Sequence, residues 1–122
     1  MAPVTDRRRR LGTDGEDAVA LWYGERGAEL LDRNWRVREG ELDLVLRWGT
    51  TLVFCEVKTR RSAAFGSPFE AVTRSKQQRL RRLGARWLAE HEVRAAQVRF
   101  DVAAVTWPPG GSPAIDVSTD AF

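Results

Sequence analysis

The residues best suited to chemistry are Asp43 in GELDLVLRW (40–48) and Glu56, Val57 and Lys58 at the end of TLVFCEVK (51–58). Carboxylates bind Mg²⁺ in proteins, together with waters and the phosphate oxygens of a substrate. Such an ion polarises a phosphodiester and helps to make hydroxide from bound water. A neighbouring ammonium orients that water or neutralises charge in the transition state. The pattern predicts a Mg²⁺ or Mn²⁺ site with Asp43 and Glu56 as metal ligands and Lys58 as a catalytic residue.

Both acidic residues lie on a predicted β-hairpin. Apolar and polar residues alternate in the first segment, whereas the second is apolar until Glu56. The alternation places Leu42, Leu44 and Leu46 on one face and Asp43, Val45 and Arg47 on the other. Gly49 and Thr50 suit a two-residue type II′ turn, which puts Asp43 directly opposite Glu56 and Lys58 on the face of Glu56. Like charges opposite each other destabilise a sheet, so the pair indicates a cation.

A structural reading of the same residues stays open at this point. Asp43 and Glu56 could instead form ion pairs with Arg47, Lys58 or Arg60 on an exposed face, and spacing alone does not separate the two readings. Of the 20 basic residues only Lys58 and Lys76 are lysines, which makes a lysine beside the acidic pair mildly informative.

The elements that position these residues are predicted to form one domain, residues 13–122, after a flexible basic arm, residues 1–12. Thr13 and Glu16 form a capping box that begins a helix, and Gly27 suits the end of that helix. The expected order is helix, three strands, helix and two strands, an α/β fold with a mixed central sheet flanked by helices. The other strands are predicted near residues 31–37, 98–107 and 114–117.

The second helix is predicted over 68–91, begun by a capping box of Ser67 and Glu70. Leu80, Leu83 and Trp87 mark its buried face, and Lys76 lies among these apolar residues. Lys76 is therefore expected to reach the site or a phosphate, unless it only covers apolar surface. The flank of this helix is a candidate DNA-backbone track or a solvated face: Arg79, Arg82 and Arg86.

Composition limits the classes of protein that fit. The chain has 122 residues, 43% of them hydrophobic and 30% charged, which is typical of one folded domain. No apolar run approaches the ~20 residues of a membrane span, and the Arg-rich start lacks the apolar segment of a secretory signal. With a single cysteine, the chain is expected in the cytoplasm. A net charge of +3 gives a mild bias toward polyanions.

The segment GELDLVLRWGTTLVFCEVKTR (40–60) resembles the D-x(n)-E-x-K core of the restriction-endonuclease-like nucleases. Over residues 11–122 the chain resembles the YraN-type family, small bacterial proteins related to archaeal Holliday-junction resolvases. The matching segments lie in this order along the chain: Gly12, Gly15-Glu16, Arg33-Asn34, FGSPFEAV (65–72), Lys76-Gln77, RFDV (99–102) and Ala121-Phe122.

This resemblance implies a restriction-endonuclease-like core fold and a metal-dependent nuclease site. It gives Asp43, Glu56 and Lys58 the catalytic roles and makes the Val57 carbonyl a further metal ligand. Glu16 matches the acidic residue on the helix of the resolvases, a role that competes with the capping box. The expected nucleic-acid contacts are Arg60, Arg61, Lys76, Gln77, Arg79, Arg82 and Arg86.

Our leading hypothesis is a Mg²⁺- or Mn²⁺-dependent endonuclease that cleaves DNA, with branched recombination intermediates as candidate substrates. The alternative is a nucleic-acid-binding module on a nuclease fold, either non-catalytic or active only with a partner protein. No membrane partner is expected. A homodimer is expected only if the resolvase analogy holds, because two opposed strands must then be cut.

Overall fold

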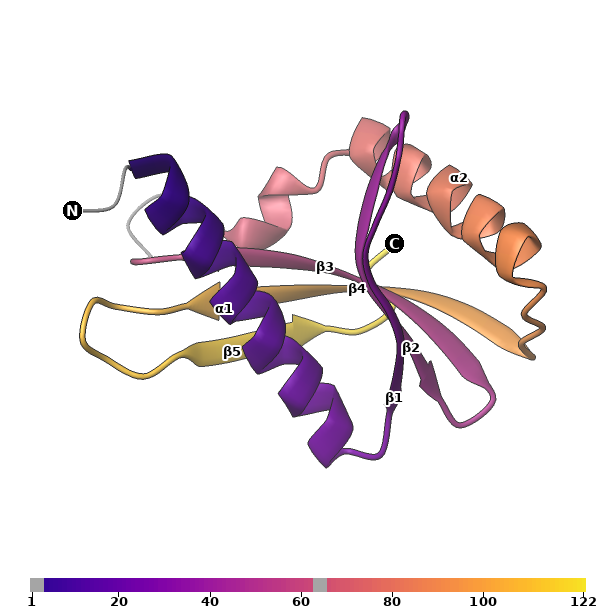
Figure 1. The fold of residues 1–122 in the computed structure, drawn as a ribbon, viewed down its shortest axis with the longest axis horizontal. Helices are drawn as coiled ribbons and strands as arrows, with labels where there is room; N and C mark the ends of the chain where they lie inside the picture. The colour runs from indigo at the N-terminus through magenta and orange to yellow at the C-terminus, as the bar shows by residue number, and fades with distance from the viewer. Residues whose placement is uncertain (1–3, 63–65) are drawn as a thin grey trace.

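The computed structural model describes residues 4–62 and 66–122, which form two α-helices, one 3₁₀ helix and a five-stranded sheet (Figure 1). The elements are α1 (Val4–Glu25), β1 (Glu29–Val37), β2 (Gly40–Trp48), β3 (Thr51–Arg60), η1 (Pro68–Ala71), α2 (Arg74–His91), β4 (Gln97–Thr106) and β5 (Ala114–Ser118). The strands lie in the order β1-β2-β3-β4-β5, with β3 and β4 parallel and the other neighbours antiparallel. The predicted α/β class and element order are confirmed, and the architecture is consistent with a restriction-endonuclease-like core.

The first helix begins earlier than predicted. Residues 4–12, expected to be part of a flexible arm, form the first turns of α1, and residues 1–3 of that arm lie outside the described residues. Arginine is a good helix former, so the run Arg7–Arg10 continues the helix rather than preceding it. The prediction of a capping box at Thr13 and Glu16 is therefore wrong, because both residues lie within the helix.

The predicted end of α1 at Gly27 is confirmed. Gly27 has a φ of 92°, a left-handed conformation that glycine adopts without strain. The Ala28 amide donates to the Tyr23 carbonyl at 3.0 Å, and the Gly27 amide donates to the Gly24 carbonyl at 3.1 Å. These two bonds form a Schellman motif, which turns the chain into β1.

The predicted hairpin register is confirmed over the described ladder. Leu44 pairs with Cys55, and the pairing continues to Trp48 and Thr51 around the two-residue turn. Gly49 has a φ of 63°, as the first position of a type II′ turn requires. The ladder ends at Leu44, one residue before the expected pair of Asp43 and Glu56.

Beyond Leu44 the β1–β2 hairpin turns away from β3 and passes beside α2 (Figure 1). This bend corrects the predicted faces of β2, because Leu42 packs with Val45 on the α2 side, whereas Leu44 and Leu46 pack on the α1 side. We call the place where β2 and β3 separate, at Asp43 and Glu56, the fork.

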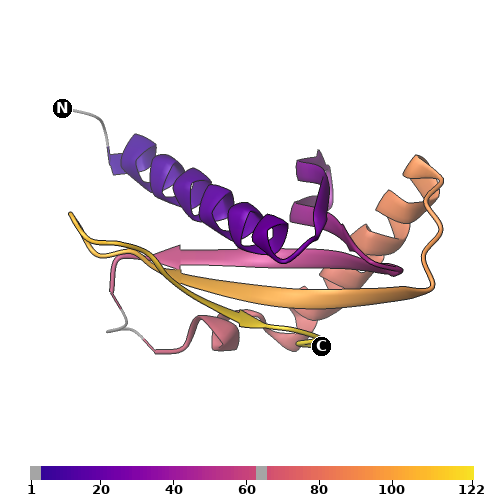
Figure 2. The ribbon, with the colours of Figure 1, turned by 90° about the horizontal axis from the view of Figure 1, so that it is seen from below.

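The helices cover opposite faces of the sheet, and each face has its own apolar core. Figure 2 shows α1 on one side and η1 with the start of α2 on the other. On the α1 side, Val19 and Tyr23 pack against inward side chains of β2, β3 and β4. On the α2 side, the predicted buried residues Leu80, Leu83 and Trp87 pack against the sheet. None of the helices in residues 4–62 and 66–122 is long and apolar enough to cross a membrane.

The predicted second helix is two elements. The Ser67 hydroxyl accepts from the Phe69 amide at 3.3 Å and caps only η1. The chain then becomes extended at Thr73, whose hydroxyl accepts from the Lys76 amide at 3.3 Å and begins α2. Val72 between them is buried, so the break turns an apolar side chain into the core. The capping residue of α2 is therefore Thr73 and not Ser67.

Candidate functional site

The fork brings together four predicted site residues from two strands: Asp43, Glu56, Val57 and Lys58. Asp43 and Glu56 are only 7% and 8% exposed, and the Val57 amide donates to Asp43 Oδ2 at 2.8 Å. The Asp43 carboxylate thus accepts a hydrogen bond from the backbone of β3 just beyond the last residue pair of the β2–β3 ladder. Lys58 Nζ lies 3.4 Å from Glu56 Oε1, as expected for side chains two residues apart on one face.

Burial and like charge act together on Asp43. Burial, and next the charge of Glu56, raise the pKa of Asp43 to about 8 despite the hydrogen bond from the Val57 amide. The carboxylates of Glu16 and Glu41 contribute in the same direction. A cation bound beside both carboxylates would oppose this effect, because a nearby opposite charge favours the ionised form of a carboxyl group.

Lys76 contacts the site, as its inward position on α2 predicted. Its Nζ lies 3.0 Å from Glu56 Oε1, closer than that of Lys58. Burial lowers the pKa of Lys58, and the neighbouring Lys76 ammonium adds to this effect. Two lysines from different elements thus share one carboxylate oxygen.

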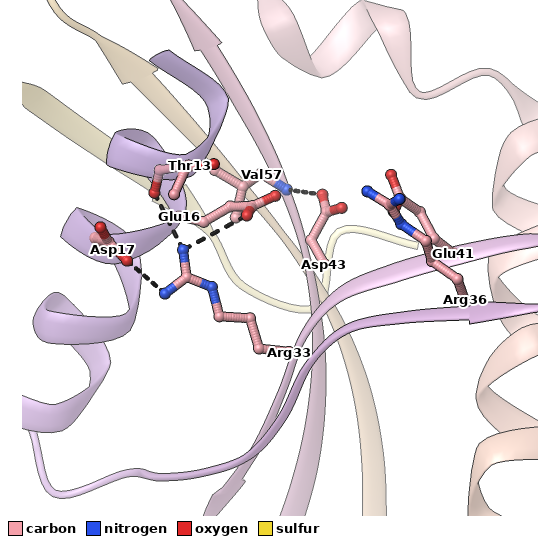
Figure 3. Close-up of polar contacts among 8 residues, drawn as sticks. All are labelled: Thr13, Glu16, Asp17, Arg33, Arg36, Glu41, Asp43 and Val57. Atoms are coloured by element: carbon pink, nitrogen blue, oxygen red, sulfur yellow. Dashed lines mark hydrogen bonds and ion pairs between the residues drawn. The ribbon is translucent and has the colours of Figure 1, made fainter. Parts of the chain in front are cut away.

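Glu16 extends from α1 toward Val57 and Asp43 (Figure 3). Its Oε1 lies 3.6 Å from Arg33 Nη2, and its side chain is 15% exposed. Burial raises the pKa of Glu16, although hydrogen bonding to Asn34 and the charge of Arg33 oppose the change. Because Glu16 lies inside α1, the competing role in a capping box no longer accounts for it.

Arg33 positions this acidic residue, and the reasoning from spacing missed it. Its guanidinium donates to the Asp17 carboxylate and, at 3.1 Å, to the Thr13 carbonyl (Figure 3). Arg33 therefore joins β1 to the α1 turn that carries Glu16. The sequence did contain a signal for Arg33: it lies midway between Leu31 and Trp35, where the alternation of a strand predicts an apolar side chain.

The donor set fits a Mg²⁺-type ion that keeps several of its waters. Among residues 4–62 and 66–122, no three His, Cys, Asp or Glu side chains lie close enough together to surround a metal. Mg²⁺ does not need such a cage, because one or two carboxylates and substrate phosphates suffice. Asp43 and Glu56 supply two carboxylates, and their mutual repulsion favours a cation between them.

The predicted nucleic-acid contacts divide into two groups. Side chains of the first group already have partners. Three of them donate to backbone carbonyls: Arg60 to Gly66, Arg61 to Trp107 at 3.4 Å, and Gln77 to Val72 at 3.1 Å. Arg86 donates to the carboxylates of Glu39 at 2.7 Å and Glu90 at 2.9 Å. Lys76 belongs to this group as well, because it contacts Glu56. The second group consists of Arg79 and Arg82, which no ion pair joins to an acidic side chain in the described part of the chain.

Comparison with known proteins identifies close relatives of unknown activity. The model of the uncharacterised protein family UPF0102 matches residues 15–105. A UPF0102 protein of Frankia alni is 54% identical over 112 residues, which cover 92% of this chain and 93% of that protein. One from Beutenbergia cavernae is 55% identical over 106 residues, 87% of this chain and 90% of its own length. One from Nocardia farcinica is 49% identical over 116 residues, with 95% and 91% covered.

Proposed function

Because the chain belongs to the uncharacterised family UPF0102, the YraN-type family, we propose its function from its own site: a metal-dependent endonuclease that hydrolyses DNA phosphodiesters. The observation that supports this proposal most strongly is the buried acidic pair at the fork, Asp43 and Glu56, with two lysines beside it. A buried pair of carboxylates that repel each other is costly, and a bound divalent cation would reduce that cost. Branched recombination intermediates are the substrates that the resemblance to resolvases favours.

Each residue of the site has a role in this proposal. Asp43 and Glu56 would hold Mg²⁺ or Mn²⁺, with the Val57 carbonyl as a further ligand. When bound, the ion supplies Lewis acidity toward the phosphodiester and lowers the pKa of water. The Val57 amide fixes the orientation of Asp43 through its 2.8 Å hydrogen bond. Glu16, held by Arg33, is an accessory acidic group on the α1 side.

Lys58 is the residue best placed to act on the attacking water. Burial lowers its pKa, so its amine gives up a proton more readily than an exposed lysine does. An amine in that state accepts a hydrogen bond from water and orients the oxygen toward phosphorus. Lys76 continues to neutralise Glu56 while Lys58 does this, because both lie near the same carboxylate oxygen.

The direct test is cleavage of labelled DNA by the wild-type chain and by Glu56→Gln. Four-way junctions, flaps, duplexes and single strands are incubated with Mg²⁺, Mn²⁺ or a chelator. We expect cleavage only with metal, and a loss of roughly 100-fold or more in Glu56→Gln, since even residues that only support ligands cost 10–100-fold when changed. The matched control is Asp116→Asn, which removes an exposed carboxylate on β5 and is expected to cleave normally.

Two outcomes would contradict the proposal. A Glu56→Gln variant that cleaves at the wild-type rate would show that a contaminant or another site is responsible. No cleavage of any substrate with either metal would refute an enzyme that acts alone, and would favour the non-catalytic or partner-dependent nucleic-acid-binding module. Unfolding curves of each variant show whether a lost activity reflects a lost fold.

A further inference from the structure

A cleft of about 270 Å³ opens directly beside Glu56, between the tip of the β1–β2 hairpin and α2. Its charged lining consists of Glu41, Glu56, Lys58, Lys76 and Arg79. The hairpin wall is held close to the helix, because a Cβ added at Gly40 would lie 3.1 Å from Leu83 Cδ1. The packing of the hairpin against α2 therefore fixes the walls of the cleft.

The charges that line this cleft do not balance. Glu41 is already paired with Arg36, at 2.8 Å between Arg36 Nε and Glu41 Oε2. Glu56 remains as the single carboxylate facing Lys58, Lys76 and Arg79. Glu56 is already paired with both lysines, so the three basic side chains outnumber the carboxylates that face the cleft, and this surplus of positive charge favours an anion there.

A second pocket, of about 190 Å³, continues from the first along α2. The two share Arg79 and Leu83, and the second adds Arg82, Arg86 and Glu39. Arg86 is neutralised by Glu39 at 2.7 Å and by Glu90 at 2.9 Å. Within the described residues, neither Arg79 nor Arg82 forms an ion pair with an acidic side chain, so both guanidinium groups can bind an anion.

We propose that Lys76, Arg79 and Arg82 form a phosphate groove, which binds consecutive backbone phosphates of one nucleic-acid strand. Lys76 and Arg79 hold the phosphate next to the reacting one, and Arg82 holds the phosphate beyond it. Arg79 and Arg82 are three residues apart and therefore side by side on the helix, as a row of anions requires. Arg86 is not part of the groove, although it lies on the same helical flank. The position of the reacting phosphate rests on the proposed function.

The groove can be tested without cleavage. Binding of a fluorescein-labelled single strand to the full-length chain is measured by anisotropy in a chelator, over a range of salt concentrations. For Arg79→Ala we expect roughly fivefold weaker binding at about 0.1 M salt and a salt slope smaller by about 0.7, the values for one lost phosphate contact. Arg82→Ala should behave in the same way.

Two variants control for a general loss of positive charge. Arg94→Ala removes an exposed arginine between α2 and β4, at the far end of the helix from Lys76. Arg86→Ala removes an arginine that is already neutralised. Both are expected to change affinity less than twofold, because neither loses a phosphate contact. Equal losses in Arg79→Ala and Arg94→Ala, or an unchanged slope in Arg79→Ala, would refute the groove.

The result also separates this inference from the proposed function. Strand binding that depends on Arg79 in a protein that never cleaves would support the groove and refute a nuclease that acts alone. Cleavage of DNA with no dependence on Arg79 or Arg82 would support the nuclease and refute the groove.

Discussion

Asp43 is expected to make the metal-free protein less stable as the pH rises. Burial, and next the charge of Glu56, raise its pKa from 3.8 to about 8. The folded chain therefore keeps this proton until about pH 8, whereas the unfolded chain loses it near pH 4. The contribution of Asp43 to the free energy of unfolding is therefore fully present below pH 4 and is lost as the pH rises through this window. Each pH unit is worth about 1.4 kcal/mol, so the whole effect is on the order of 5 kcal/mol.

Asp43→Asn removes this titration and keeps the shape of the side chain. Its amide oxygen can still accept from the Val57 amide, the bond that spans 2.8 Å in the wild type. We expect Asp43→Asn to match the wild type near pH 4 and to be more stable by a few kcal/mol near pH 8. The assay is guanidinium unfolding between pH 4 and pH 9 in a chelator. Asp116→Asn, at an exposed carboxylate, is the matched control and should follow the wild-type curve.

Adding metal reverses the order of the two proteins. Millimolar Mn²⁺ should stabilise the wild type near pH 8, because an ion that binds only the folded chain shifts the unfolding equilibrium. Asp43→Asn lacks one of the two carboxylates and should gain little. Parallel pH curves for wild type and Asp43→Asn in the chelator would refute the electrostatic reasoning. Equal stabilisation of both proteins by Mn²⁺ would refute the assignment of the ion to the fork.

Two further predictions concern the scaffold. Gly15→Ala should destabilise the fold by roughly 1–3 kcal/mol in thermal unfolding, although alanine favours a helix, because its Cβ would clash with the Thr59 side chain. Adding Thr59→Ala should restore part of the loss, and a Gly15→Ala protein that is more stable than wild type would contradict this close packing. Tyr23→Phe should cost roughly 1–3 kcal/mol in guanidinium unfolding, because it removes the 2.6 Å hydrogen bond to the fully buried Asp101. An unchanged midpoint would show that Arg99 and the Asp120 amide together satisfy that carboxylate.

Sequence reasoning succeeded where local rules decide the structure. The turn at Gly49 and Thr50 allowed the register of β2 against β3 to be worked out, and the ladder follows it to Leu44 and Cys55. Lys76 was expected to point inward from its place among apolar residues, and it contacts Glu56. In both cases the deciding residues are close together in sequence or share one helix face.

It failed where two local signals compete or where the partner is distant. Thr13 and Glu16 match a capping box, but the arginines before them are equally good helix residues, and the helix continues through them. The buried Asp101 carboxylate accepts from Arg99, two residues away, at 2.8 Å. Tyr23, another donor to the same carboxylate, lies 78 residues away, and no pattern near either residue indicates that contact.

The fork shows why the site itself was only half predictable. The pairing rule put Asp43 opposite Glu56, where a continued ladder would have joined the two residues as ordinary sheet neighbours. The ladder ends one pair earlier, and the Val57 amide donates to the Asp43 side chain. The hairpin then leaves the sheet and lies against α2, and the cleft lined by Glu56 and Lys76 opens between them. This separation depends on Leu42 packing on the α2 side, away from Leu44. Leu42→Asn, which weakens that packing, should therefore reduce strand binding in the phosphate groove although it touches no phosphate contact.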